Sequence, residues 1–305
     1  MKKYIFTGET KVVNEITLHR IVAVRNFSNV YKGDLGGWIE SEENLSHDYN
    51  AWVYDDAQVY GNAKIRGNAK IRGNANVYEN TNVHGDAQVC GNAKIYGNAH
   101  VYDNVQVYGN AKICGNAKIS GNAQVYGNAQ VYGNALVYND AQVYGNAWVY
   151  GYAKVCSGAH VYDDAEVYEN ADVYGNADVY ETAKVYGNAK VCGNANIYGS
   201  TDVYGDAKIC YDADVCNNTD YIVFKNFWSS GRYFTWTRSN NMWSVGCFYG
   251  TGEELIKKAY ADSEESGREY ERVVRYVESI LADKQKTKHK FLYKILRFIY
   301  KVLYA

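Results

Sequence analysis

The sequence predicts an all-β solenoid, a rod of short parallel strands, and three observations support this prediction. An aliphatic residue recurs at every sixth position from Val53 to Val215, and each of the 28 occurrences is Val or Ile. Ala stands two positions before it in most units, and Gly-Asn lies between most units. Proline is absent from the 305 residues, although ordinary usage would give about 15. Repetition at a short fixed period is typical of a solenoid.

The six-residue unit, Gly-Asn-Ala-x-Val-Tyr, indicates how such a rod is built. In an extended segment, residues two apart point to the same face, so Ala and Val face inward while x and Tyr face outward. Gly and Asn suit a corner, because both tolerate positive φ. A single unit is too small to bury its inner face, so the units must stack. The absence of proline fits, since nearly every coil needs its backbone N–H donors.

Composition and cysteine content indicate a cytoplasmic protein. An apolar fraction of 47% with 22% charged residues excludes wholesale disorder. Gly8, Glu9 and Lys11 interrupt any signal-peptide core, and no apolar run reaches the ~18 residues of a membrane span. Seven cysteines, an odd number, favour free thiols in a reducing compartment. Cys192 and Cys210 are 18 residues apart and should stack on adjacent coils, but we expect them to be reduced.

We expect four segments: an N-terminal β cap (1–50), the β-helical rod (51–216), a C-terminal α+β cap (217–283) and a basic amphipathic helical tail (284–305). After the rod, three runs alternate like strands: Tyr221–Phe224, Tyr233–Thr237 and Met242–Phe248. Capping boxes at Thr251–Glu254 and Ser266–Glu269 predict the starts of two helices. We expect this α+β segment to cover the open end of the rod, as solenoids require.

The tail carries seven Lys or Arg and no acid, which leaves the rest of the chain at −9. Four of these residues form one helical stripe: Lys290, Lys294, Arg297 and Lys301. Such a cationic amphipathic helix can lie on an anionic membrane surface. Packing on the α+β segment, or association with other copies, is the alternative.

The repeat resembles the hexapeptide-repeat, left-handed β-helix superfamily, in which a small residue follows an aliphatic residue by four places, here Ala129 after Val125. The match covers residues 51–216. Gly33–Asp48 looks like the cap of uncharacterised bacterial and phage hexapeptide proteins that are often labelled acyltransferases. Three units make one triangular coil in that superfamily, so the resemblance implies a single-stranded left-handed β-helix of about nine coils, ~45 Å long at ~4.8 Å per coil.

The resemblance requires a test for catalysis, because the superfamily contains acyltransferases and metal-dependent carbonic anhydrases. As in such enzymes, a site would need an inserted loop, a histidine base or metal-binding histidines, and a trimer interface. The six-residue frame has no insertion. His84 and His100 are the weak catalytic candidates, since 18-residue coils place them on neighbouring coils of one side. No third ligand is evident and zinc takes three or four, so we expect no metal and no cofactor.

Outward tyrosines fall into columns when the chain is folded at 18 residues per coil. One column holds Tyr108, Tyr126, Tyr144, Tyr162, Tyr180 and Tyr198, another holds Tyr132, Tyr150, Tyr168, Tyr186 and Tyr204, and a glutamine column holds Gln88, Gln106, Gln124 and Gln142. Stacked rings and amide ladders stabilise in-register strands by themselves. The functional interpretation is that the tyrosines bind a sugar, a nucleobase or a protein. Trp52, Trp148 and Leu136 also face outward and indicate a partner surface.

Charge divides along the rod, with +2 over residues 51–120 and −8 over residues 121–216. This gradient suits end-to-end or antiparallel association, although salt would screen it. The absence of a basic stripe on the rod disfavours nucleic-acid binding.

We predict a non-enzymatic, rigid solenoid scaffold or binding protein that uses its tyrosine columns. The alternative is a trimeric, acyl-CoA-dependent enzyme of the acyltransferase type with a site between subunits. The expected partners are further copies of the chain, as a trimer or end to end, a protein or small molecule, and an anionic membrane through the tail. We expect the protein in the cytoplasm, or at the inner face of the membrane.

Overall fold

The computed structural model describes the backbone of residues 1–303 and the side chains of residues 1–284 and 286. The chain divides into two compact units. The first contains Met1–Tyr221 and Arg238–Asn240, and the second contains Ile222–Thr237 and Asn241–Ala305.

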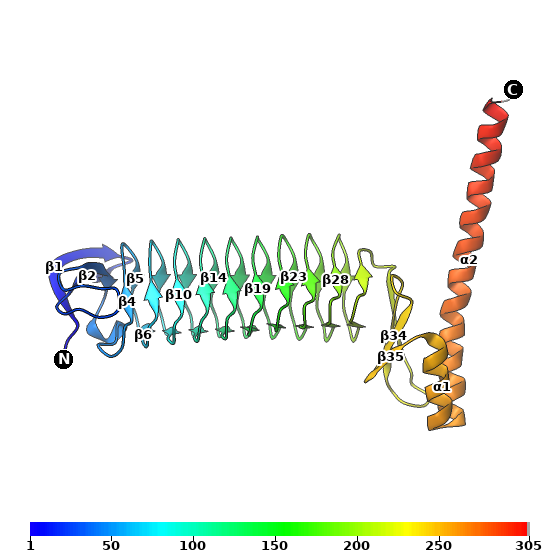
Figure 1. Ribbon diagram of the computed structural model, residues 1–305, viewed down its shortest axis with the longest axis horizontal. Helices are drawn as coiled ribbons and strands as arrows, with labels where there is room; N and C mark the ends of the chain where they lie inside the picture. Colours follow the sequence, from blue (N-terminus) through cyan, green and yellow to red (C-terminus); the bar gives the residue numbers. More distant parts are fainter. Residues whose placement is uncertain (304–305) are drawn as a thin grey trace. The chain divides into compact units, whose positions relative to one another are not determined.

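The first unit contains the predicted parallel β-solenoid, which is thereby confirmed (Figure 1). Each six-residue unit contributes one strand, from β4 (Trp52–Val53) to β31 (Asp214–Val215). Every strand pairs in parallel with the strand three units further on, so that Val125 lies opposite Val143. Three units therefore make one coil of 18 residues, and the rod has three faces.

The first face contains nine rod strands: β5 (Gln58–Val59), β8 (Asn76–Val77), β11 (Lys94–Ile95), β14 (Lys112–Ile113), β17 (Gln130–Val131), β20 (Trp148–Val149), β23 (Glu166–Val167), β26 (Lys184–Val185) and β29 (Asp202–Val203). The second face contains ten: β4, β7 (Lys70–Ile71), β10 (Gln88–Val89), β13 (Gln106–Val107), β16 (Gln124–Val125), β19 (Gln142–Val143), β22 (His160–Val161), β25 (Asp178–Val179), β28 (Asn196–Ile197) and β31. The third face contains nine: β6 (Lys64–Ile65), β9 (Asn82–Val83), β12 (His100–Val101), β15 (Lys118–Ile119), β18 (Leu136–Tyr138), β21 (Lys154–Cys156), β24 (Asp172–Val173), β27 (Lys190–Val191) and β30 (Lys208–Ile209).

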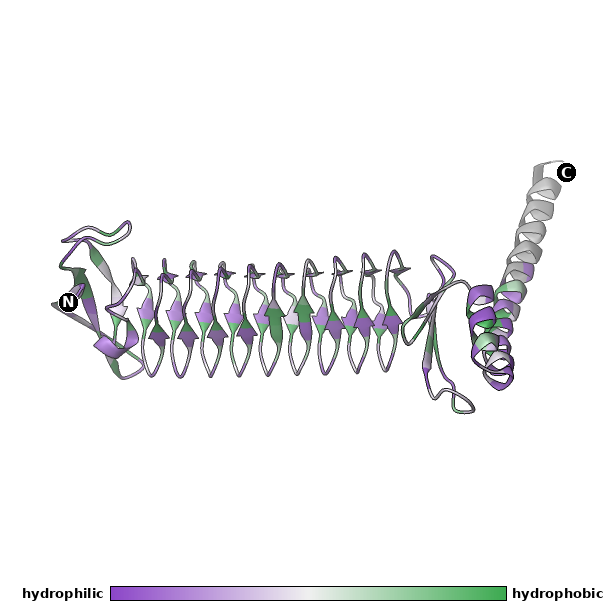
Figure 2. Cartoon of the chain, turned by 60° about the horizontal axis from the view of Figure 1, so that its bottom comes forward, coloured by the Kyte–Doolittle hydropathy of each residue, from purple (hydrophilic) through white to green (hydrophobic). Residues whose placement is uncertain are grey.

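The interior of the rod is built from the small and branched residues of the repeat. Ala123 and Val125 have no exposed surface, and the same is true of their counterparts in the other coils. Along each strand the hydrophobic inward residues alternate with more hydrophilic outward ones (Figure 2). Ala and Val at alternate positions thus fill the narrow interior, as the period-two pattern predicts.

The corners divide their work between Gly and Asn. Gly127 adopts φ +71°, but Asn128 is not among the residues with positive φ. The amide of Asn128 instead donates from Nδ2 to Oδ1 of Asn146 on the next coil (2.9 Å) and accepts from Asn110 on the previous coil (3.0 Å). Asn therefore serves as a rung of an amide ladder, so its predicted role as a positive-φ bend residue is wrong.

Acidic residues replace Gly at several corners and bond to the next coil. Asp103 adopts φ +63° and its carboxylate accepts the backbone N–H of Gly121 (3.1 Å). Glu169 accepts the N–H of Gly187 in the same way (2.9 Å). This charge-assisted bond offsets part of the cost of a side chain at positive φ.

Two antiparallel pairings build the N-terminal cap. β1 (Tyr4–Val13) pairs with β2 (Ile16–Ala23), and β2 pairs with β3 (Leu35–Ile39), which continues in parallel with β5 on the first face. A short 3-10 helix, η1 (Glu42–Asn44), follows. The cap therefore extends the first face of the rod.

Trp52 lies beneath this cap, and its predicted exposure is wrong. It is only 1% exposed. The ring of Phe27 lies 5.3 Å from it and the ring of Tyr4 lies 6.1 Å from it, both edge-on. The hexapeptide pattern places position 52 outward, but the cap covers this face of the first coil.

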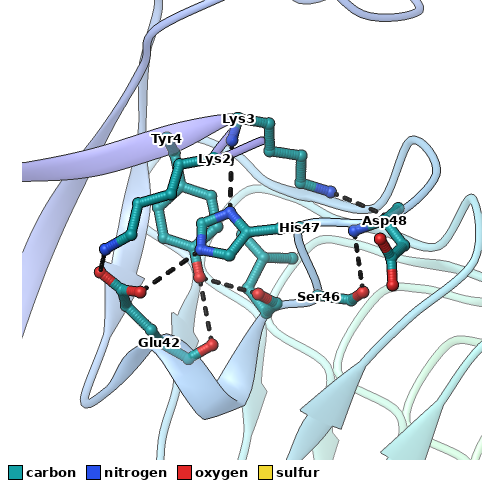
Figure 3. A network of polar contacts seen from close by, with 8 residues as sticks. Lys2, Lys3, Tyr4, Glu42, Ser46, His47 and Asp48 are labelled. Carbon is teal, nitrogen blue, oxygen red and sulfur yellow. Dashed lines mark hydrogen bonds and ion pairs between the residues drawn. The ribbon is translucent and has the colours of Figure 1, made fainter.

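A polar network ties the N-terminus to the first coil (Figure 3). Lys3 is fully buried, and its Nζ donates to the carbonyl oxygen of Ala51 (2.7 Å). Tyr4 donates from its hydroxyl to the carbonyl oxygen of Leu45 (2.7 Å), and its ring stacks on His47 at 4.3 Å. Burial lowers the pKa of Lys3 to about 8. These buried bonds fix the position of the cap on the rod.

The second unit combines a four-stranded sheet with two helices. The strands β32 (Tyr221–Lys225), β33 (Tyr233–Thr237), β34 (Met242–Val245) and β35 (Phe248–Gly250) lie in sequential order. The helices are α1 (Gly252–Asp262) and α2 (Glu264–Leu303). The core between sheet and helices includes Phe234, Trp236, Trp243, Leu255 and Val274. The third predicted strand is divided in two by a turn at Gly246, where φ is +58°.

The helix starts agree with the sequence at one of two places. The capping box of α1 is confirmed, because Thr251 accepts the N–H of Glu254 (3.3 Å) and donates its own N–H to the Glu254 carboxylate (2.8 Å). The box predicted at Ser266 is wrong, since α2 begins at Glu264 and Ser263 accepts the N–H of Ser266 (3.1 Å). Helix α2 continues unbroken across residues 283 and 284, where the tail begins.

Candidate functional site: the tyrosine columns

The longest stack of tyrosines follows the second face, immediately after the strands β13 to β28. We call it the second-face column, and it consists of Tyr108, Tyr126, Tyr144, Tyr162, Tyr180 and Tyr198. Successive ring centroids are 4.7–5.1 Å apart, and the interplanar angles are 1–8°. The spacing follows from the pitch of the rod, because each ring is attached one coil above the last.

A second stack follows the first face. This first-face column consists of Tyr132, Tyr150, Tyr168, Tyr186 and Tyr204, with centroids 4.9–5.4 Å apart. A further stack of Tyr60, Tyr78 and Tyr96, spaced 5.0 and 5.1 Å, lies on the same face and was missed in the sequence. Its 18-residue spacing could have revealed it, but Cys114 separates it from Tyr132.

The stacking limits what the columns can bind. Each internal ring has a parallel neighbour on both of its faces, so no room remains for a flat ligand between the rings. A sugar or nucleobase therefore cannot stack inside a column. What the columns present to solvent is a row of ring edges and hydroxyl groups, a surface that combines apolar and polar contacts with little conformational freedom. This surface suits a protein partner better than a flat small molecule.

Neighbouring side chains orient some of these hydroxyl groups. Tyr126 donates to Oε1 of Gln142 (3.2 Å), and Tyr150 donates to the carboxylate of Glu166 (3.0 Å). Glu166 also pairs with Lys184 at 2.9 Å. The columns thus form one polar network with the outward residues of the next coil. The glutamines predicted as a ladder lie directly opposite one another on the second face.

Burial within the stacks raises the pKa of the column tyrosines. The pKa of Tyr144 rises to about 12, chiefly through burial, and the nearby Tyr126 and Asp178 add to the effect. Burial also raises the pKa of Tyr150, and its hydrogen bond to Glu166 raises it further. These hydroxyls therefore stay protonated near neutral pH and act as hydrogen-bond donors.

This shift predicts that the rod loses stability in alkali. A group whose pKa is higher in the folded state stabilises fully below its unfolded value, here 10.0, and this contribution is lost as pH rises through the folded value. Spectrophotometric titration of tyrosinate should show the native chain ionising at higher pH than the chain in urea. Superimposable native and urea curves would contradict the raised pKa values.

A missing ring interrupts the first face at Cys114, which lies between Tyr96 and Tyr132. A hydrogen bond from the Cys114 thiol, together with burial, raises the pKa of Tyr96 to about 12. The gap separates two stacks that the register would otherwise join into one.

Filling this gap should stabilise the rod. We expect Cys114→Tyr to add two stacked pairs, each worth about 0.5–1.5 kcal/mol, and to raise the free energy of unfolding by about 1–3 kcal/mol. Cys114→Ser is the matched control, because it removes the thiol but leaves the gap. Thermal and urea unfolding would measure both variants, and a Tyr variant no more stable than the Ser variant would refute the stacking contribution.

Of the other outward apolar residues, Trp148 is 41% exposed and Leu136 is half-buried. Trp148 lies edge-on to Tyr132 at 6.4 Å. The predicted exposure at position 148 is thus observed, and Trp148 extends the apolar part of the first-face column.

The two candidate catalytic histidines share one hollow on the third face. His84 follows β9 and His100 lies on β12, and these strands pair with each other. Both histidines line a hollow of about 440 Å³ together with Lys64, Arg66, Gly67, Asn82 and Gly85. His84 also stacks on Tyr102 at 5.3 Å. The lining contains two cations and no carboxylate, so this hollow suits an anion.

Metal coordination finds no support at this hollow. Within the described part of the chain, no three residues of the types His, Cys, Asp and Glu are grouped so that they could hold a metal ion. The four predicted tail residues, Lys290, Lys294, Arg297 and Lys301, lie outside the residues whose side chains are described. In the same described part, no helix is long and apolar enough to span a membrane.

Cys192 and Cys210 are joined by a disulfide between neighbouring coils of the third face, so the expectation of reduced thiols is wrong for this pair. Their Cα atoms are 4.4 Å apart, and both side chains are buried. Stacking in register brings residues 18 apart within bonding distance. The other five cysteines are free.

Comparison with known proteins agrees with this architecture. A family model described as the YdcK beta solenoid repeat matches residues 87–103, 123–139, 129–143 and 141–157. The rod resembles the YdcK beta-solenoid repeat. This confirms the predicted resemblance to hexapeptide-type solenoid proteins with acyltransferase labels.

One curated relative is the uncharacterized acetyltransferase YdcK of Escherichia coli (strain K12). It is 32% identical over 63 residues, which are 18% of this chain and 19% of the relative. The alignment thus spans less than a fifth of either protein. The YdcK-type repeat accounts for the rod, and the activity of the whole chain is a separate question.

Proposed function

We propose that this protein is a rigid, non-enzymatic scaffold whose tyrosine columns hold a protein partner. The observation that supports this function is the unbroken second-face column, six parallel rings at 4.7–5.1 Å. The rod has one strand for every unit from β4 to β31, and no loop is inserted between coils to build a pocket. A straight row of oriented hydroxyls on a rigid frame is suited to binding an extended protein surface.

Rigidity is the second requirement of a scaffold, and the coils supply it. Outward side chains stack, corner amides form ladders, and backbone N–H groups bond to the next coil throughout the rod. Each coil contacts only its neighbours, so the rod behaves as a one-dimensional stack. Its length can therefore change by whole coils without altering the surface that each coil presents.

A second candidate function is acyl transfer, and one observation favours it. His84 and His100 line a hollow with Lys64 and Arg66, where the cations could bind the phosphates of an acyl-CoA donor while a histidine accepts the proton of the acceptor. The printed name of the YdcK relative points the same way. In this function the hollow would lie between subunits of a trimer.

Acetyl-CoA distinguishes the two functions. For a scaffold, we expect acetyl-CoA to leave the melting temperature unchanged, and His84→Ala and His100→Ala to behave like the parent chain. The proposal would be overturned by a trimer in light scattering whose melting temperature rises with acetyl-CoA, if either histidine substitution abolished the rise.

A further inference from the structure

Two large aromatic side chains of the second unit are exposed without a structural reason in the fold. Phe227 and Trp228 are 73% and 79% exposed, and we call them the aromatic tip. They lie in the loop between β32 and β33, whereas Phe234 and Trp236 of the same hairpin are buried in the core. The other five tryptophans are at most 41% exposed. Packing of the unit therefore does not require the tip.

The loop that carries the tip is well ordered by hydrogen bonds. Asn226 is 5% exposed, and its Oδ1 accepts the N–H groups of Trp228 (3.0 Å) and Ser229 (3.2 Å). Its Nδ2 donates to the hydroxyl of Ser229 (2.8 Å). The hydroxyl of Tyr270 on α2 lies 3.0 Å from that of Ser230. The fold thus holds two apolar rings in water at a fixed place beside α2.

Positive charge surrounds the tip. Lys225 lies 5.1 Å from the centroid of the Phe227 ring, and Arg232 follows the loop. Residues 222–237 contain these two cations and no acid. The same unit ends in the segment 284–305 with seven more cations and no acid. Trp and Phe flanked by Lys and Arg are typical of a segment that enters the interface of an anionic membrane.

Acidic side chains of the unit are concentrated on α1 and the first half of α2, where arginines partly neutralise them. Arg275 pairs with Glu253 (2.6 Å) and Glu278 (2.9 Å), and Arg272 pairs with Glu269. The hairpin and the terminal segment therefore remain as the cationic parts of the unit.

We propose that the aromatic tip inserts into an anionic lipid surface and that the basic segment 284–305 is the second contact of the same anchor. Two side chains are too small for a stable protein interface, which buries about 800 Å² per partner, but a lipid interface needs no shape complementarity. The basic segment begins 14 residues after Tyr270, or ~21 Å along the helix at 1.5 Å per residue. An α2 that lies along the surface can bring both contacts to it.

Sedimentation with vesicles tests this anchor in the full chain. We expect wild-type protein to sediment with phosphatidylcholine vesicles that contain phosphatidylglycerol, and much less with phosphatidylcholine alone. Phe227→Ser combined with Trp228→Ser should reduce partitioning roughly tenfold or more, given the apolar surface removed. Tyr152→Ser is the matched control, since Tyr152 is 63% exposed on the rod, and it should sediment like wild type.

Fluorescence and charge variants make the test specific. Tryptophan emission should shift to shorter wavelength with anionic vesicles, and Trp228→Phe should abolish the shift. Changing Lys290, Lys294, Arg297 and Lys301 to Gln should also weaken binding, and added salt should weaken the wild type. The proposal would be overturned by a wild type that ignores anionic vesicles, or by a tip variant that binds them as well as the Tyr152 control.

Discussion

A Gly127→Ala variant should lose about 2–4 kcal/mol of unfolding free energy, through backbone strain at positive φ and through overpacking against the next coil. Gly127 has φ +71°, and a Cβ added there would lie 2.9 Å from the carbonyl oxygen of Gly145. Gly205→Ala separates the two causes, because Gly205 has φ +66° but nothing within 4 Å of the added Cβ. This control should lose only about 1–2 kcal/mol, the cost of the backbone conformation.

A third variant tests the role of the corner acids. Gly127→Asp adds the same Cβ but also a carboxylate that can accept the N–H of Gly145, as Asp103 does with Gly121. We therefore expect Gly127→Asp to be more stable than Gly127→Ala in urea unfolding. Equal stability of the Gly127→Ala and Gly205→Ala variants would show that the close approach of the coils costs nothing.

Removing three residues should damage the rod more than removing eighteen. Deletion of Gly121–Tyr138 excises one whole coil, joins residues of equal phase, and leaves each remaining coil with equivalent neighbours. It should cost about one coil's share of the stability. Deletion of Gly127–Ala129 removes a corner, so that Val125 and Val131 can no longer both face inward from successive strands. We expect this change to cost more than ~4 kcal/mol, beyond the range of most single substitutions.

Thermal unfolding followed by circular dichroism compares the two deletions. The chain can absorb the short deletion only by extruding three more residues and rotating every later unit by one face, which breaks the columns and amide ladders at that point. A short deletion that melts at the same temperature as the whole-coil deletion would contradict the 18-residue coil.

The sequence was sufficient to predict the rod, because one rule repeats in it. Spacing of Val and Ile alone indicates a strand every six residues, and 18-residue stacking places Tyr108 beneath Tyr126 and His84 beside His100. The gap at Cys114 hid a third stack, although the same arithmetic contained it. Local periodicity thus carries most of the information in a structure where each coil contacts only its neighbours.

Other features depend on contacts between segments that obey no repeat. Trp52 follows the outward pattern, but Phe27 and Tyr4 from the cap cover it. The start of α2 was misplaced because Ser263, rather than Ser266, provides the terminal hydroxyl. The aromatic tip was missed because its apolar letters resemble those of the buried strands on either side, and only the fold distinguishes them.

The most direct test of the scaffold function is photocrosslinking in the cells that make this protein. An azidophenylalanine at position 162, in the middle of the second-face column, should yield one protein adduct of defined mass after illumination. The same residue at position 152, which is 63% exposed but lies at a corner outside the columns, should yield none. Adducts of equal yield at both positions, or none at positions 126, 162 and 180, would contradict a partner on the tyrosine column.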